Sequence, residues 1–142
     1  MVFKMRILFF SKAGNSELMA QAISREQKAG CDKIPPAYPC ESEKLLFIGV
    51  ETTKKTAPRE VVDFCNGLTP ARAKNVAFFG IGPSFEALDE LKAIVEKNGV
   101  GIAGKPHQCT VKSGLFKAGK VTDADLAAAA KWSNEIVQSM VG

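Results

Sequence analysis

The sequence predicts one α/β domain in which helices cover both faces of a parallel sheet. Four apolar runs with β-branched or aromatic residues alternate with segments whose apolar residues repeat at helical spacing. The runs are continuous rather than alternating with polar residues, as is typical of strands buried on both faces of a parallel sheet. A length of 142 residues, 46% of them hydrophobic, suits a single core. We therefore expect a doubly wound sheet spanning residues 1–142.

The first part of the chain predicts three strands and one helix. "RILFF" at 6–10 is a buried strand, and the apolar spacing that follows predicts a helix over 18–28. Residues 32–34 are expected to form a short edge strand. The rest of 31–44 reads as a loop, because its three prolines remove ladder donors and prevent a regular helix. "KLLFIGV" at 44–50 then predicts a central strand.

The middle of the chain predicts two helices around a third long strand. "PREVVDFCNGL" at 58–68 has proline in its first turn and a repeating apolar face, which favours a helix. "NVAFFGIG" at 75–82 predicts a buried strand. Residues 84–97 again show helical spacing, and Asn98-Gly99 is a typical helix end.

The last part of the chain predicts a weaker strand and a long helix. The strand signal in "VGIAG" at 100–104 continues into "HQCTV" at 107–111. Thr122 and Asp125 have the spacing of a capping box, which predicts the start of a helix that continues to Met140 and packs across the sheet.

Composition argues against several classes of function. A net charge of +4 without an arginine-rich stripe does not indicate nucleic-acid binding. The four cysteines lack Cys-x-x-Cys spacing and the only histidine is His107, so we expect reduced thiols and no metal site. No segment approaches the length of a membrane span, and a cytoplasmic protein is expected.

The turn after the first strand is the clearest candidate site. In "FFSKAGNSELMAQAI" a strand stops in a small polar turn that leads directly into a helix. The first N–H groups of a helix have no intrahelical partners, and the helix dipole places partial positive charge there. Such a turn suits a phosphate group.

Ser11-Lys12-Ala13-Gly14-Asn15-Ser16 resembles the FMN phosphate loop of the flavodoxin family, Ser/Thr-x-Thr-Gly-Asn-Thr. "GIGPSFEAL" is similar to the family's loop that holds an aromatic ring over the flavin, and "KSGLFKAGKVTDADL" is similar to its approach to the final helix. The resemblance covers nearly the whole chain. It implies a three-layer α/β/α sandwich with a parallel five-stranded sheet in the order 2-1-3-4-5.

The resemblance also implies roles for particular residues. Ser11, Asn15 and Ser16 would donate side-chain hydrogen bonds to the FMN phosphate, and the backbone N–H groups of residues 12–16 would surround it. Lys12 would add positive charge, and Gly14 would allow a positive φ or a close ligand approach. The two loops flanking the flavin would contribute Glu51, Thr52, Thr53, Gly82, Pro83, Ser84 and Phe85. Phe85 has an alternative role as an apolar anchor at the start of its helix.

Four features depart from the family pattern. Ala13 stands where the family has a hydroxyl donor, and "GVETTKKTAP" offers threonines and lysines where the family usually has a Trp or Tyr against the flavin. The segment between the second and third strands is too short for the usual helix. The net positive charge also differs from typical flavodoxins, which are acidic.

The expected function is FMN-dependent electron transfer to a protein redox partner, with the flavin performing the redox chemistry and no residue acting as an acid or base. Two alternatives stay open: a flavodoxin-fold binding module that has lost FMN, and a small NAD(P)H-dependent flavin reductase. A phosphatase of similar fold is disfavoured, because residues 11–22 contain neither a cysteine nucleophile nor an arginine.

Overall fold

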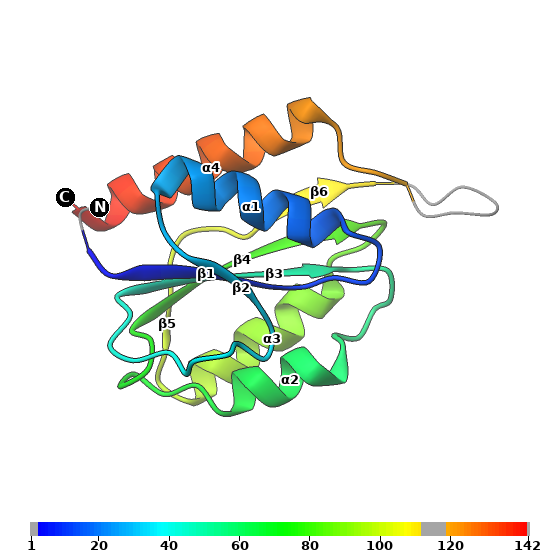
Figure 1. The fold of residues 1–142 in the computed structure, drawn as a ribbon. Coiled ribbons are helices and arrows are strands. Elements are labelled where there is room, and N and C mark those ends of the chain that lie inside the picture. The colour runs from blue at the N-terminus through cyan, green and yellow to red at the C-terminus, as the bar shows by residue number, and fades with distance from the viewer. Residues whose placement is uncertain (1–2, 112–118, 142) are drawn as a thin grey trace.

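The computed structural model describes residues 3–111 and 119–141, which form an α/β/α sandwich (Figure 1). Its strands are β1 (Met5–Phe10), β2 (Cys31–Lys33), β3 (Leu45–Glu51), β4 (Asn75–Gly82), β5 (Gly101–Ile102) and β6 (His107–Thr110). Its helices are α1 (Asn15–Gln27), α2 (Arg59–Asn66), α3 (Glu86–Lys97) and α4 (Asp123–Val141).

The sheet is parallel and has the order β2-β1-β3-β4-β5, which confirms the predicted order. The fifth position is divided between two strands: β5 pairs with the beginning of β4, and β6 pairs with its end. Gly104, with φ +65°, and Pro106, which has no N–H, lie between them. This backbone interrupts the pairing, so the predicted single strand becomes two.

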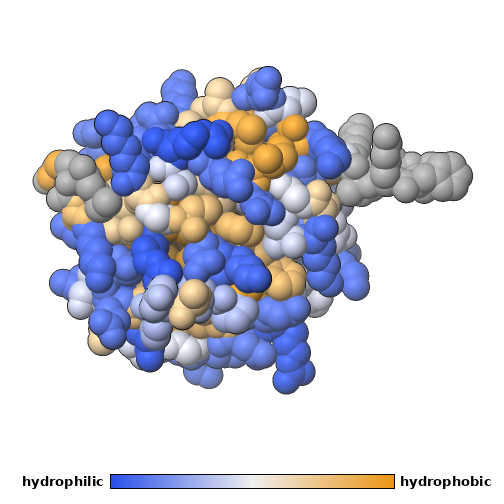
Figure 2. Space-filling model, viewed as in Figure 1, coloured by the Kyte–Doolittle hydropathy of each residue, from blue (hydrophilic) through white to orange (hydrophobic). Residues whose placement is uncertain are grey.

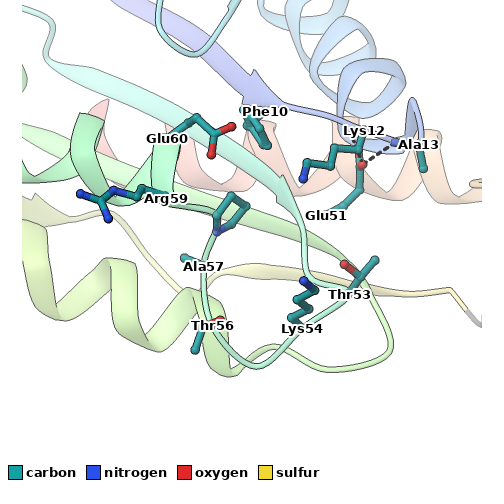
Figure 3. A pocket seen from close by; sticks show the side chains of 11 residues that line it. Phe10, Lys12, Ala13, Glu51, Thr53, Lys54, Thr56, Ala57, Arg59 and Glu60 are labelled. Carbon is teal, nitrogen blue, oxygen red and sulfur yellow. Dashed lines mark hydrogen bonds between the residues drawn. The ribbon is translucent and has the colours of Figure 1, made fainter.

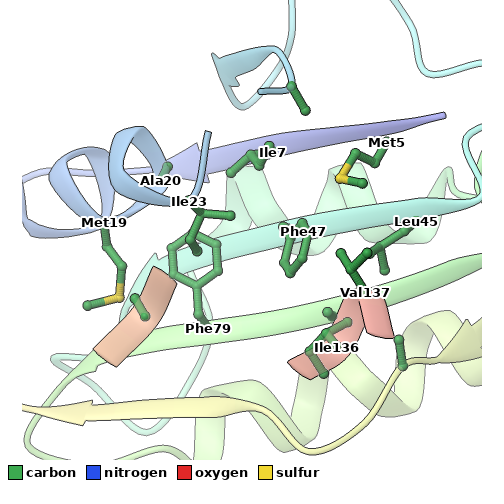
Figure 4. Close-up of a cluster of buried hydrophobic side chains, with 14 of the residues drawn as sticks. Met5, Ile7, Met19, Ala20, Ile23, Leu45, Phe47, Phe79, Ile136 and Val137 are labelled. Atoms are coloured by element: carbon green, nitrogen blue, oxygen red, sulfur yellow. The ribbon is translucent and has the colours of Figure 1, made fainter. Parts of the chain in front are cut away.

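Alternate residues of the central strands enter two separate cores. Odd-numbered residues such as Ile7, Phe47 and Phe79 pack with α1 and α4, whereas even-numbered residues such as Leu8 and Ile48 pack with α2 and α3. Figure 4 shows the first core, in which side chains from three strands meet those from the two helices. Burial on both faces explains why the strands read as continuous apolar runs.

Two predicted helix ends, the start of α4 and the end of α3, are confirmed in detail. At the start of α4, Thr122 N–H donates to Asp125 Oδ2 (2.9 Å) and Asp125 N–H donates to Thr122 Oγ1 (3.2 Å), a reciprocal capping box. Asn98 ends α3, and Gly99 follows with φ +85°. As predicted, the chain passes from β2 to β3 without an intervening helix.

The outer surface is mostly hydrophilic in the view of Figure 2, with smaller apolar areas between the charged side chains. Within residues 3–111 and 119–141, no helix has the length and apolar character to cross a membrane. The same residues contain no cluster of His, Cys, Asp and Glu side chains suited to hold a metal ion.

Candidate functional site

The candidate site lies at the carboxyl ends of β1 and β3. The chain leaves β1 toward β2 on one side and leaves β3 toward β4 on the other, so strand order reverses between these two neighbours. Loops diverge at such a switch point, and open α/β sheets bind ligands there. The turn predicted to hold phosphate, residues 11–16, starts at this edge.

The geometry of this turn is that of an anion-binding loop. Gly14 has φ +93°, a left-handed conformation that favours glycine, and its carbonyl accepts the first helical hydrogen bond, from Leu18 N–H (3.0 Å). Helix α1 therefore begins at Asn15, earlier than the predicted residue 18. Ser11 Oγ accepts from Gly14 N–H (2.9 Å), which holds the turn closed. The N–H groups of Lys12, Ala13 and Ser16 converge on one place.

The carboxylate of Glu51 occupies that place. Its Oε1 accepts from the backbone N–H groups of Lys12 (2.7 Å) and Ala13 (2.8 Å). Its Oε2 accepts from Ser16 N–H (2.8 Å) and Ser16 Oγ (2.7 Å), and it also accepts from Ser11 Oγ. Three amides and two hydroxyls thus converge on one anion, as Figure 3 shows in part for the Ala13 bond. The carboxylate is held where the resemblance places a phosphate.

Strand geometry explains why Glu51 points into the loop. Side chains alternate along β3, and Glu51 has the same parity as Phe47, which faces α1 and α4. Phe10 pairs with Val50, so Glu51 ends β3 beside the first residue of the turn. The side chain is directed toward the N-terminus of α1, where negative charge is stabilised.

Two opposing effects act on the pKa of Glu51. Partial burial alone would raise it, but the hydrogen bonds from Ala13, Ser11 and Ser16 favour the charged form, and the net result is a pKa below the usual value. The carboxylate is therefore ionised at neutral pH.

The other predicted phosphate ligands are placed differently. Asn15 is buried, and its side chain bridges to the segment before α4: Nδ2 donates to Gly119 O (2.9 Å), and Oδ1 accepts from Val121 N–H (3.0 Å). Ser16 is fully buried, and its one hydroxyl proton is shared between Glu51 Oε2 (2.7 Å) and Phe10 O (2.8 Å). Of the predicted side-chain donors, Ser11 and Ser16 face the anion position, while Asn15 holds two elements together.

The residues predicted to flank a flavin lie in two loops that touch. Thr52 is buried and its N–H donates to Ile81 O (2.8 Å), extending the pairing of β3 with β4. Gly82 lies so close that a Cβ there would be 2.5 Å from Thr52 O. Phe85 is the N-cap residue of α3 and packs, partly buried, against the core shared with α2, where an apolar anchor would lie. Pro83 is exposed and Ser84 is half-buried.

Two cavities adjoin Glu51. A small one of about 10 Å³ lies toward Thr53, Gly82 and Pro83, where the resemblance places the flavin. A larger one of about 320 Å³, shown in Figure 3, lies between the loop at 11–16 and the loop at 51–60. The larger volume is within the range of small-molecule sites.

Sequence reasoning did not name several residues that line the larger cavity. They include Phe10, Thr56, Ala57, Pro58, Arg59 and Glu60. Phe10 could have been found as the last residue of a strand that ends at the switch point. Thr56, Ala57 and Pro58 belong to the loop after β3, which has no distinctive motif, and Arg59 and Glu60 form the first turn of α2.

An FMN phosphate fits the donors of this loop but not the present position of Glu51. The donor set is the one a phosphate needs, because all five groups already bind an anion. A phosphate and the carboxylate would compete for the same donors and repel each other. The loop can hold FMN only when Glu51 has moved out.

Comparisons with known proteins support the fold alone. No protein-family model matches the sequence, and no curated protein matches it. Flavodoxin 2 from Bacillus cereus has a TM-score of 0.74 at 16% identity, covering 96% of this chain and 99% of that one. A short-chain flavodoxin associated with a bacterial microcompartment has a TM-score of 0.71 at 13% identity, over 96% and 98% of the two chains.

A flavodiiron core from Synechocystis has a TM-score of 0.71 at 18% identity; the match covers 97% of this chain but only 36% of that protein. The chain therefore matches whole flavodoxins and about a third of a larger protein. Together with the strand order, the three-layer arrangement and the loop at the switch point, these matches show that the chain has the flavodoxin-like fold.

Proposed function

We propose that this protein binds FMN and transfers electrons, with the FMN phosphate held by residues 11–16 after Glu51 has left the loop. One observation carries the proposal: three backbone amides and two hydroxyls at a helix N-terminus converge on a single anion. Two solved structures of the same fold are described as flavodoxins, which is why we favour FMN over other phosphates.

In this proposal the flavin supplies the redox chemistry, and the chain binds and orients it. The amides of Lys12, Ala13 and Ser16 hold the phosphate, and the hydroxyls of Ser11 and Ser16 complete the set. Thr53, Gly82 and Pro83 are the nearest predicted residues toward the ring. The net charge of +4 favours a protein redox partner with an acidic docking face.

Flavin fluorescence tests this function. Titrating FMN with the protein should quench the fluorescence, and Gly14→Asp should abolish the quenching, because it places a negative charge in the loop and strains a position with positive φ. Gly30→Asp adds the same charge at an exposed glycine outside the site and should bind like the wild type. Circular dichroism shows whether each variant is folded. Unchanged fluorescence at saturating wild-type protein contradicts the proposal.

A second function, a flavodoxin-fold binding module without FMN, is favoured by a specific observation. Glu51 already accepts hydrogen bonds from the N–H groups of the loop. The two flanking loops touch at Thr52 and Gly82, and no aromatic residue occurs in 51–57 to stack on a flavin. In that case the carboxylate is a permanent part of the fold. Protein that quenches neither FMN nor riboflavin supports this function over the first.

A further inference from the structure

We propose that Glu51 is an internal ligand of the loop at 11–16 that competes with phosphate and so controls whether a phosphate-bearing cofactor binds. The inference rests on the proposed function, since it names what regulates the same site. It extends that function by assigning to one side chain an inhibitory role that the loop motif does not suggest.

The competition follows from how the donors are used. Both oxygens of Glu51 are engaged, and together they accept from five groups of the loop: the N–H groups of Lys12, Ala13 and Ser16 and the hydroxyls of Ser11 and Ser16. Gly14 N–H is already bound to Ser11 Oγ. A phosphate can therefore use these five donors only by taking them from the carboxylate.

Charge strengthens the competition. Glu51 is ionised in the loop, and a phosphate ester is also anionic at neutral pH. Two like charges a few ångströms apart in a partly buried site repel each other, and the repulsion is weakly screened by solvent. Joint occupancy is therefore unfavourable, and the two states of the loop exclude each other.

The surroundings give the displaced carboxylate a place to go. Glu51 is the last residue of β3 and is only half-buried, so its side chain can turn without breaking the strand pairing. It also lines the 320 Å³ cavity, whose other charged lining residues are Lys12, Lys54, Arg59 and Glu60. Arg59 Nε lies 3.7 Å from Asp63 Oδ2, so Lys12 and Lys54 are the cations that the carboxylate can approach, with Glu60 opposing them. Figure 3 shows the amino groups of Lys12 and Lys54 directed into this space. Room and opposite charge are both available beside the loop.

The experiment compares FMN and riboflavin binding, by fluorescence quenching, for the wild type, Glu51→Ala and Glu96→Ala. Glu96 is exposed on α3, so its variant makes the same change in charge away from the site. Riboflavin lacks the phosphate and reports the ring contacts alone. Glu51→Gln is the second variant: it keeps the side-chain volume and removes the charge, and it decides the result if Glu51→Ala does not fold.

The expected result is that Glu51→Ala binds FMN about tenfold or more tightly than the wild type, since charge-assisted donors become free for the phosphate. Glu51→Gln should change FMN affinity in the same direction. Riboflavin affinity should not change, and Glu96→Ala should behave like the wild type. If the wild type and both Glu51 variants bind FMN with equal affinity, the inference is overturned while the proposed function stands.

If none of these proteins binds FMN, the proposed function fails, and inorganic phosphate decides the inference separately. Phosphate should then shift the backbone amide signals of Lys12, Ala13 and Ser16 in Glu51→Ala but not in the wild type, as observed by NMR. Amide signals that stay unchanged in the variant overturn the inference as well.

Discussion

The space beside the Cα of Gly49 is filled, so that no larger residue fits there. Gly49 lies in β3 directly opposite Phe79 of β4, and the Phe79 ring covers the space that a side chain at position 49 would need. An ideal Cβ at Gly49 would be 2.0 Å from this fully buried ring. The ring has little room to move, because it packs among α1, α4 and the edge of Trp132.

Gly49→Ala should therefore destabilise the protein by about 1–3 kcal/mol through overpacking. Urea unfolding measures the change. Gly30→Ala is the matched control, because nothing lies within 4 Å of its Cβ position, and the free energy of unfolding should stay the same or rise slightly. If the two substitutions change the free energy of unfolding equally, the Phe79 ring does not fill the space beside Gly49.

Glu51 shows that naming a site residue does not give its role. The resemblance places it among residues that flank the flavin, whereas the structure puts its carboxylate in the loop at 11–16 as the bound anion. The sequence contains the necessary signal, since strand parity directs residue 51 toward α1. The choice between facing a ligand and replacing it depends on distances that only coordinates give.

The elements around the site are joined by one buried amide. Asn15, the first residue of α1, is bonded through both ends of its side chain to Gly119 and Val121, just before α4. The two helices that cover one face of the sheet are thereby fixed relative to each other at the end nearest the loop. No local sequence pattern predicts this contact, because its partners are more than 100 residues apart in the sequence.

Asn15→Ala should lower the free energy of unfolding by about 1–3 kcal/mol, because two hydrogen bonds of a buried side chain are lost and their partners are left unpaired. Denaturant unfolding monitored by circular dichroism measures this. Asn66→Ala, at an exposed position at the end of α2, should have little effect. If Asn15→Ala is as stable as that control, the side chain does not hold the two helices together.

The elements themselves were largely predictable. Continuous apolar runs identified β1, β3 and β4, and cap residues identified the starts or ends of α3 and α4, because burial and capping are local properties of the sequence. The division of the fifth strand was not predicted, since it depends on which part of β4 each piece can reach. The first turn of α1 was missed because its residues are polar.

For the whole molecule, the strand order and the switch point determine where a ligand can bind. The resemblance to the flavodoxin family implied the strand order, and the residue pattern itself predicted a doubly wound sheet and the loop that supplies the donors. Neither predicted that the flanking loops touch at Thr52 and Gly82 or that the larger cavity lies on the other side of Glu51, because loop paths depend on tertiary packing. The account of this molecule therefore depends on one claim: at neutral pH the loop is filled by its own carboxylate.

An NMR titration of the Glu51 side-chain carboxyl carbon, together with the amide signals of Lys12, Ala13 and Ser16, tests this claim most directly. The loop hydrogen bonds favour the charged form, so the pKa is depressed. The stabilisation from these bonds is then complete above the unfolded value of about 4.3 and is lost as the pH falls through the folded pKa. We predict a midpoint below about 4.3 that is shared by the carboxyl carbon and the three amides. A midpoint at or above about 4.3, with amide signals that do not follow it, would contradict the account.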